Sequence, residues 1–417
     1  MLAMLAFTAC SSNSDDAVAD APQFWHVTLT ATMGDATTRA LSEGENYAIT
    51  ASFAENDQVV VVDADGTTIV GTLKAQSAGA STTLSGTLNA TSLIDGEVVT
   101  LRYRSATANY DGQVGTLAGI AASQDYAEGT LTVSTASPLT FTSNSVTLEA
   151  KQSITKFSFT DGTSPVNVKT FGIAAVGLVQ NIAADATSSE RVGAVTGTLA
   201  TASADVYVAL RNNTDTKQTY SFTVKDNDGN WYTGTKKANL TNGKSYTATV
   251  TLTKLETLTG SSAVGTIGVV GGLPAIVISG NIAVALMNAG ALCPEDYGEY
   301  YTFANQTSGL SNDWYVPSKD ELDALAGISI SSTWGAPNGV NGCKFTIGGN
   351  TLFLPAAGYR ENGSSLLFVS TDGYYWSSTL TDNSNLAFYL DIDNTGATPL
   401  SEYIVNRLTV RPFHALP

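Results

Sequence analysis

Histidine and cysteine are scarce in this chain, and charged residues are few. The 417 residues include two histidines, His26 and His414, and three cysteines. So few imidazoles leave little scope for histidine-based catalysis or for a histidine-rich metal site. Charged residues make up 14% of the chain, against a usual share of about 25%.

Positive charge and long apolar runs are also lacking. The formal net charge is −17, and a chain without a basic stripe cannot displace counterions from phosphate, which argues against nucleic acid as a partner. The same charge argues against attraction to anionic lipid head groups. Nothing reaches the roughly 18 consecutive apolar residues of a membrane span, because glycine, proline and asparagine interrupt the apolar segment 264–292. Any membrane anchor is therefore expected to be something other than a helix.

Small and β-branched residues take the place of the missing charge. Thr, Ser, Ala, Gly and Val dominate, with Tyr and Phe scattered among them. β-Branched residues suit a pleated, half-buried surface, and Gly, Asn and Asp suit turns. The composition is typical of extracellular β-structure, and the length predicts two to four domains.

The first ten residues, MLAMLAFTAC, resemble a lipobox, in which a short apolar run and small residues precede a cysteine. The resemblance implies that residues 1–9 are a lipoprotein signal peptide and that Cys10 is acylated, with residues 10–22 as a polar tether. The protein would then be anchored by lipid in the outer membrane of a Gram-negative, Bacteroides-like cell. The basic start of a signal peptide is missing. The alternative is a chance cysteine after an apolar start.

Cys293 and Cys343 remain once Cys10 is assigned to the lipid. Export permits a disulfide between them. Two buried free thiols are the alternative, and the sequence leaves both open.

Strand patterns fill residues 23–257 and indicate two successive β-domains. Apolar and polar residues alternate from Trp25 to Ala31, which predicts a half-buried strand. The apolar run Val59–Val62, which lies between polar residues, predicts a strand covered on both faces. We place the first domain at 23–142 and the second at 143–257, where a new series of strands opens at Ser145.

The region 262–417 differs, because it holds most of the prolines and tryptophans and one convincing helix. Ser318 and Glu321 form a capping box that predicts a helix from Ser318 to Ala326. Leu322 and Leu325 would face the core at i, i+3 spacing. The expected fold class is mainly β, with two β-sandwiches followed by an α+β domain.

Residues 24–255 resemble a fimbrillin, the pilin of Bacteroidales built from two Greek-key β-sandwiches. The lipobox, the strand 25–31, the segment Thr37-Thr38-Arg39-Ala40 and the closing strand 242–250 carry this resemblance. In fimbrillins an arginine-specific protease removes the first strand, and a neighbouring subunit's strand fills the groove. The resemblance therefore implies cleavage between Arg39 and Ala40, and other pilin subunits as partners. The alternative is that Arg39 is an ordinary surface arginine and that the first strand stays in place.

Residues 264–417 resemble the C-type-lectin-like domain of Bacteroidetes surface proteins, also called the FISUMP or major-paralogous domain. Its segments appear here in order as 294–301, 314–322, 353–360, 373–378 and 407–412. Where a stalk pilin would donate a strand, this chain continues into that domain. We therefore interpret it as the tip or an anchored accessory subunit of a fimbrium. A non-polymerising surface lipoprotein is the main alternative.

The ligand of the lectin-like domain is expected to be a surface glycan or a protein. We predict contacts by four aromatic residues: Tyr300, Tyr301, Trp334 and Tyr374. Packing beneath long loops is the alternative for all four. No cofactor is expected, because no known calcium–sugar motif is present, although several carboxylates and amides could bind calcium: Glu295, Asp296, Asn305, Asn312, Asp313 and Asn338.

Catalysis is the rival function from another class. The lectin-like fold is shared with formylglycine-generating enzymes, whose chemistry uses cysteines. Cys293 and Cys343 are the candidates, but no histidine lies near them in sequence to act as a base. We therefore expect a protein that is not an enzyme.

Overall fold

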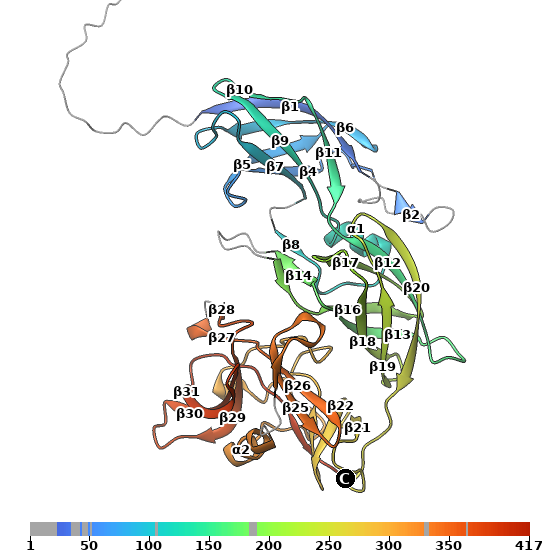
Figure 1. Cartoon of the computed structure of the whole chain (residues 1–417), viewed down its shortest axis with the longest axis vertical. Coiled ribbons are helices and arrows are strands. Elements are labelled where there is room, and N and C mark those ends of the chain that lie inside the picture. The colour runs from blue at the N-terminus through green and yellow to red at the C-terminus, as the bar shows by residue number, and fades with distance from the viewer. Residues whose placement is uncertain are drawn as a thin grey trace, which may run out of the picture.

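The computed structural model describes residues 23–34, 42–43, 49–50, 52–104, 107–182, 190–328, 333–363 and 366–417. The predictions for Cys10, Arg39 and Ala40 lie outside these residues. The described chain is mainly β with few helices, as predicted. It forms three domains that follow one another along the long axis (Figure 1). Among the described residues, no helix has the length and apolarity needed to cross a membrane.

The first domain is a single β-sheet wrapped around its own core. Its strands are β1 (Phe24–Met33), β4 (Gln58–Val62), β5 (Ile69–Ala75), β6 (Ser81–Asn89), β7 (Val98–Tyr103), β9 (Ala127–Ala136), β10 (Leu139–Phe141) and β11 (Ser145–Ala150). A separate pair is formed by β2 (Ser42–Glu43) and β3 (Ile49–Thr50). The strand order is β10-β9-β11-β1-β6-β5-β4-β7, and β9 pairs with β7 as well. That extra pairing closes the sheet. β1 lies in its interior, with β11 and β6 as hydrogen-bonded neighbours.

The predicted boundary at residues 142 and 143 is wrong. β11, which we expected to open the second domain, pairs in parallel with β1 and antiparallel with β9. Conversely, the segment 107–126 leaves the first domain and places Tyr110 and Ile120 in the second core. The alternation of apolar residues predicts that a strand exists but does not reveal which sheet it joins.

The second domain contains the segment 107–126 and residues 151–254. Its elements are β8 (Ala108–Asn109), α1 (Leu117–Ser123), β12 (Ser153–Thr160), β13 (Val168–Ala174), β14 (Leu178–Ile182), β15 (Glu190–Val192), β16 (Val195–Ser203), β17 (Asp205–Asn212), β18 (Gln218–Asp226), β19 (Trp231–Ala238) and β20 (Ser245–Lys254). The strand order is β15-β14-β17-β12-β20-β19-β18-β13-β16, with β8 on β14. Its core is rich in aromatic rings, with Phe157, Phe159 and Phe222 in mutual contact.

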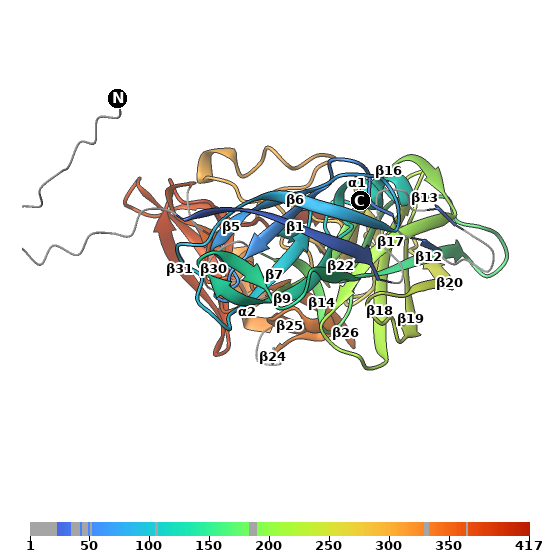
Figure 2. The ribbon, with the colours of Figure 1, turned by 90° about the horizontal axis from the view of Figure 1, so that it is seen from above.

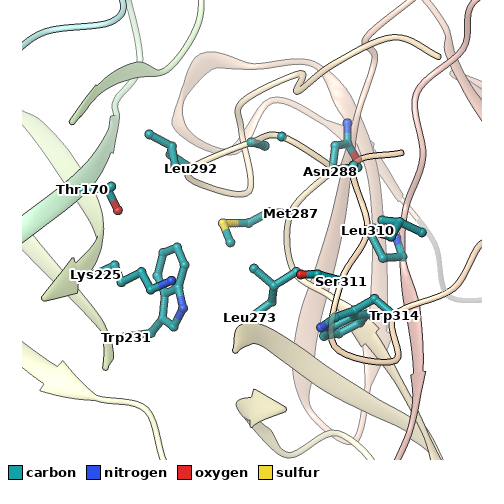
Figure 3. Close-up of a pocket in the computed structure, with 15 residues that line it drawn as sticks. Thr170, Lys225, Trp231, Leu273, Met287, Asn288, Leu292, Leu310, Ser311 and Trp314 are labelled. Carbon is teal, nitrogen blue, oxygen red and sulfur yellow. The ribbon is translucent and has the colours of Figure 1, made fainter. Parts of the chain in front are cut away.

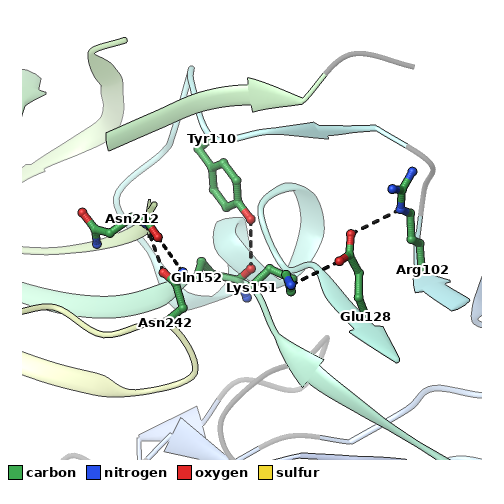
Figure 4. A network of polar contacts seen from close by, with 7 residues as sticks. All are labelled: Arg102, Tyr110, Glu128, Lys151, Gln152, Asn212 and Asn242. Atoms are coloured by element: carbon green, nitrogen blue, oxygen red, sulfur yellow. Dashed lines mark hydrogen bonds and ion pairs between the residues drawn. The ribbon is translucent and has the colours of Figure 1, made fainter. Parts of the chain in front are cut away.

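Besides the segment 107–126, Lys151 and Gln152 join the first domain to the second, and both are held in place (Figure 4). Gln152 is fully buried; its Oε1 accepts hydrogen bonds from the Tyr110 hydroxyl and the Tyr126 amide, each at 3.2 Å. Glu128 of the first domain forms ion pairs with Lys151 and Arg102, both at 3.2 Å. The connection is therefore a packed joint.

The C-terminal domain consists of four small sheets and one main helix. Its elements are β21 (Ile267–Val270), β22 (Leu273–Ser279), β23 (Ile282–Ala285), η2 (Phe303–Asn305), α2 (Lys319–Ile328), β24 (Thr333–Gly335), η4 (Pro337–Gly339), β25 (Gly342–Ile347), β26 (Asn350–Pro355), β27 (Tyr359–Arg360), η5 (Glu361–Gly363), β28 (Leu366–Leu367), β29 (Gly373–Leu380), β30 (Leu386–Asp393), β31 (Gly396–Tyr403) and β32 (Phe413–Ala415). The sheets are β21-β22-β23-β32, β24-β25-β26, β27-β28 and β29-β30-β31.

The predicted helix and its capping box are confirmed in α2. The Ser318 amide donates to Glu321 Oε2 at 2.8 Å, and the Glu321 amide donates back to Ser318 Oγ at 3.3 Å. Leu322 and Leu325 are buried in the domain core, as predicted. In both views the sheet β29-β30-β31 lies on the opposite side of the molecule from β18 and β19 of the second domain (Figure 2).

Candidate functional site

β1 lies in a slot between β6 and β11, and its own sequence explains the fit. Phe24 through Thr32 pair antiparallel with β6, and Thr30 through Met33 pair in parallel with β11. Every second side chain points into the core, as the alternation predicts. Three of these inward side chains are large and at most 7% exposed: Val27, Leu29 and Met33.

The outer face of β1 is held by neutral polar groups. The Thr32 hydroxyl donates to Ser81 Oγ at 3.2 Å, and His26 Nε2 lies 3.0 Å from Ser85 Oγ. The strand FWHVTLTATM contains no Asp, Glu, Lys or Arg. Its contacts are therefore backbone pairing, apolar burial and hydroxyl contacts, none of which needs one particular sequence.

Loss of β1 would leave a large apolar slot. Burying three such side chains contributes roughly 5–9 kcal/mol, at about 1.5–3 kcal/mol each. That is comparable to the whole stability of a small domain, roughly 5–15 kcal/mol. Removing β1 would also expose unpaired N–H and C=O groups along β6 and β11. An emptied first domain would therefore need a replacement strand.

The disulfide between Cys293 and Cys343 does not form, and the alternative of two buried thiols holds. The two residues pack in different places. Cys293 lies against Ala174 and Ala194 of the second domain, whereas Cys343 lies on β25 within the core of the C-terminal domain. Burial raises the pKa of the Cys293 thiol well above its usual value, and the carboxylates of Glu295 and Asp296 add to the shift.

The four predicted ligand-contacting aromatics do not share one exposed surface. Tyr301 is buried, and its hydroxyl donates to Glu299 Oε2 at 3.0 Å. Tyr300 is half-buried, and its hydroxyl donates to the Ala357 carbonyl at 2.5 Å. Trp334 is half-buried on β24. Packing, the alternative reading, therefore accounts for Tyr300 and Tyr301.

Tyr374 belongs to a group of four rings that sequence reasoning largely missed. Tyr359, Phe368, Tyr374 and Tyr389 lie in contact, and Phe368 is 53% exposed. We call these four residues the aromatic cluster. Their positions are scattered over thirty residues of sequence, so no local pattern reveals them. The tyrosine-rich segment 373–378 was the one available signal.

Two of the three carboxylates considered for calcium, Glu295 and Asp296, have other roles. Glu295 is buried, and its Oε1 accepts a hydrogen bond from Asn338 Nδ2 at 2.6 Å. Asp296 accepts from the amides of Leu292 and Gly298, and burial raises its pKa to about 6. No group of three or more His, Cys, Asp or Glu that could hold a metal ion occurs in the described ranges.

A pocket of about 260 Å³ lies between the second and C-terminal domains (Figure 3). Two tryptophans, one from each domain, bind the same turn beside it. The indole N–H of Trp231 donates to the Gly272 carbonyl at 2.8 Å, and that of Trp314 to the Gly271 carbonyl at 3.1 Å. Gly271 has a φ of 53°, and a Cβ there would lie 2.6 Å from Trp314 Nε1. The close approach therefore requires glycine.

The chemistry of this pocket suits domain docking better than catalysis. Lys225 is the one ionisable side chain among the residues that line it, and its ammonium group lies 5.4 Å from the centre of the Trp231 ring. Met287 and Leu273 supply apolar walls. A lone ammonium group next to apolar side chains offers no paired acid and base.

Comparisons with known proteins give partial matches. A family model described as "Domain of unknown function (DUF8237)" matches residues 345–413. No curated protein matches the chain.

Solved structures similar to this chain come mainly from Bacteroidales. A protein assigned to cell adhesion from Bacteroides uniformis is 13% identical, with a TM-score of 0.32, and the match covers 55% of this chain and 96% of that one. The tip fimbrial protein Mfa3 from Porphyromonas gingivalis, with C-terminal truncation, is 10% identical, with a TM-score of 0.27, and the match covers 51% of this chain and 81% of that one. A fimbrial assembly protein from Parabacteroides distasonis is 11% identical, with a TM-score of 0.28, and the match covers 55% of this chain and 92% of that one. Identities and TM-scores this low do not by themselves carry a functional argument.

Proposed function

We propose that this protein is a cell-surface adhesion subunit of a fimbrium, and that its first domain accepts a strand from a neighbouring subunit in place of β1. The position of β1 is the observation that carries the proposal. It is an uncharged strand inside a closed sheet, paired on both sides and buried on one face. A foreign strand with the same alternation would satisfy the same backbone groups by β-augmentation.

Cleavage after Arg39 would release β1. Arg39 lies six residues beyond Met33, the last residue of β1. A protease acting there would leave the nearest described partners, β6 and β11, covalently in place. The cleaved strand would then be held only by noncovalent contacts and could be displaced.

The C-terminal domain favours a place at the end of the fibre. The last strand of the second domain, β20, leads directly into the C-terminal domain through Leu255 and Leu258, and Leu258 is buried among C-terminal residues. The segment after β20 is therefore not a free donor arm. An acceptor of this kind would terminate a fibre and present its C-terminal domain, which resembles a C-type-lectin-like domain, to a glycan or protein ligand.

Mass-spectrometric mapping of the N-terminus tests the proposal on protein taken from its native cell surface. We expect a start at Ala40 and its loss in an Arg39→Lys variant. An Arg407→Lys variant is the matched control and should still be cleaved between Arg39 and Ala40. A mature start at acylated Cys10, with β1 attached and no neighbouring strand bound, would overturn strand exchange. The same spectra would show whether Cys10 is acylated, which tests the lipid anchor.

A non-polymerising surface lipoprotein is the second candidate. It shares all three domains and differs in keeping β1, which is already paired with β6 from Phe24 to Thr32 and with β11 from Thr30 to Met33. We further propose that neither form is an enzyme. The raised pKa of the buried Cys293 thiol works against a reactive thiolate, and substrate turnover by the purified chain would contradict this.

A further inference from the structure

Phe368 is held in a backbone conformation that a bulky residue rarely adopts. Its φ is 58°, in the left-handed region, and its side chain is 53% exposed. The amides of Thr371 and Asp372 donate to its carbonyl at 3.1 and 3.0 Å, which fixes this turn. Such strain persists where the surroundings enforce it and is concentrated at functional sites. Here the strained backbone places a phenyl ring in solvent.

The exposed ring continues into a row of stacked aromatics. The ring of Phe368 is nearly parallel to that of Tyr359, at 15° and with 6.0 Å between centres. Tyr359 lies 4.9 Å from Tyr374, which stacks on Tyr389 at 5.3 Å and 26°. Three strands and one turn contribute these rings, so the aromatic cluster is rigid. The result is a partly exposed platform of two stacked pairs, which meet at an angle of 57° between the rings of Tyr359 and Tyr374.

Carboxylates surround the platform. Tyr374 lies in the field of Asp391, Asp372 and Glu402, which together with burial raise the pKa of its phenol. Burial, helped by the nearby charges of Asp372 and Asp393, raises the pKa of Asp391 to about 6. Two arginines adjoin the cluster: Arg360 lies over the Tyr300 ring at 5.4 Å, and Arg407 pairs with Arg360 in an antiparallel bridge. The negative field disfavours acidic ligands.

We propose that the aromatic cluster is a binding site for a neutral glycan. The C–H face of a sugar ring would stack on Phe368 and Tyr359, and its hydroxyls would donate to carboxylates at the rim, such as Glu402. Rings of this kind offer large contact area at low entropic cost. The field of the carboxylates would exclude sialylated and sulfated sugars by charge. A second copy of this chain would bring the same acidic face and be repelled. This inference rests on the proposed adhesive role and names its ligand class.

The two ends of the aromatic cluster lie in different parts of the C-terminal domain, because β27 and β28, next to Phe368, are at the end nearest β14 (Figure 1). The sheet β29-β30-β31 carries Tyr374 and Tyr389 and lies on the far side of the C-terminal domain from β18 and β19 (Figure 1). The second domain therefore leaves this sheet uncovered.

The test is binding of the full chain to immobilised glycans: neutral galactose- and N-acetylglucosamine-terminated oligosaccharides and their sialylated and sulfated counterparts. We expect at least tenfold stronger binding to a neutral member than to its acidic counterpart. Phe368→Ala should reduce that binding at least tenfold, and Phe368→Trp should retain it. Phe24→Ala is the matched control, because Phe24 is also an exposed phenylalanine, at 63% exposure, but lies in β1; it should bind as wild type.

Phe368→Gly separates binding from folding. Glycine accepts a positive φ without strain, so this variant should melt at a higher temperature than wild type and yet lose glycan binding. Wild-type binding by Phe368→Gly, preference for sulfated or sialylated glycans, binding of a basic peptide alone, or no glycan binding at all would overturn the inference.

The assay does not depend on strand exchange. An Arg39→Lys chain that keeps β1 should bind glycan equally well if the inference holds, even where no fibre forms. Failure of polymerisation with retained glycan binding would count against strand exchange alone. Fibre formation without glycan binding would count against this site alone.

Discussion

β1 of the first domain and β12 of the second domain occupy equivalent places in their sheets. β1 lies between antiparallel β6 and parallel β11, the last strand of its domain. β12 lies between antiparallel β17 and parallel β20, again the last strand of its domain. The two domains therefore share an arrangement in which the last strand runs beside β1 or β12 in the same direction.

The two strands differ in how they are attached and buried. β12 follows β11 after two residues, one of which is the fully buried Gln152, and its first three residues are buried as well. β1 is separated from the next strand of its own closed sheet, β4, by residues 34–57. A strand joined to its sheet through such a long segment can be cut away, whereas β12 is fixed at its start by a packed joint. Equivalent topology is thus combined with a long connecting segment at β1 and a packed joint at β12, which is the difference that the proposed strand exchange requires.

Removal of β1 should give the largest effect. A chain beginning at Ala40 should show roughly 100-fold faster amide hydrogen exchange in β6 and β11, because these strands lose a partner. Exchange in β17 and β20 should not change, and a peptide of residues 23–34 should restore protection. Unchanged exchange in β6 would mean that another segment closes the gap.

Core truncation in the two strands should affect different domains. Leu29→Ala in β1 should destabilise the first domain by about 2–5 kcal/mol, and Phe157→Ala in β12 the second by about 3–5 kcal/mol. Calorimetry of the full chain should show each variant shifting its own transition. Thr28→Ala, on the exposed face of β1, should change stability by less than about 0.5 kcal/mol. A single transition shifted equally by both truncations would contradict separate domains.

Acidity should stabilise the joint between the two domains. Burial raises the pKa of Asp125 to about 7 from 3.8, with Asp57 adding to the shift and Arg104 and Gln152 opposing it. Below pH 4 the Asp125 carboxyl is protonated in both the folded and the unfolded protein, so its burial does not lower the stability. Between pH 4 and 7 the unfolded state ionises while the folded state keeps its proton. Stability should therefore fall over that range, by an amount on the order of a few kcal/mol, and level off above it.

The Asp125→Asn variant should lose most of this pH dependence in urea unfolding measured at pH 4, 5, 6 and 7. Asp215→Asn, at an exposed position, is the matched control and should retain it. An equal slope in wild type and Asp125→Asn would show that Asp125 is ionised in the folded protein.

Surface ion pairs should give the smallest effect. Glu128→Gln removes two pairs of 3.2 Å at the joint and should cost up to about 1 kcal/mol. Asp205→Asn removes one pair of 3.5 Å with Lys156 in the second domain, where the acid is 51% exposed, and should cost less. Thermal melts in low and high salt would measure both. A larger loss in Asp205→Asn would reverse the comparison.

Local patterns predicted local structure well. The alternation in β1, the fully buried run Val59–Val62 and the capping box of α2 all depend on neighbours within a few residues, and the structure confirms each. The parallel pairing of β1 with β11 joins segments more than a hundred residues apart, and both strands carry the same alternation as many others. Nothing in such a pattern selects the partner, so the domain boundary was misplaced.

The binding surface was predictable only in part. Tyr374 was identified because aromatic residues are common at interfaces, but Phe368 and Tyr359 come from a turn and a two-residue strand. A left-handed φ at a phenylalanine contradicts its intrinsic preference, so sequence alone argues against it. The docking of Trp231 on Gly272 likewise depends on how two domains meet, which their separate sequences do not specify.

The parallel pairing of β12 with β20 has a mechanical consequence. After β11 the chain returns to the second domain at the start of β12, and it leaves that domain at the end of β20. The parallel pairing runs from Ile154 beside Ser245 to Thr160 beside Thr251. Tension between a bound ligand and the cell would pull these strands in opposite directions along their common axis. The load then falls in shear on all the hydrogen bonds of the ladder at once, instead of unzipping them one at a time. The second domain is thus built to resist pulling force.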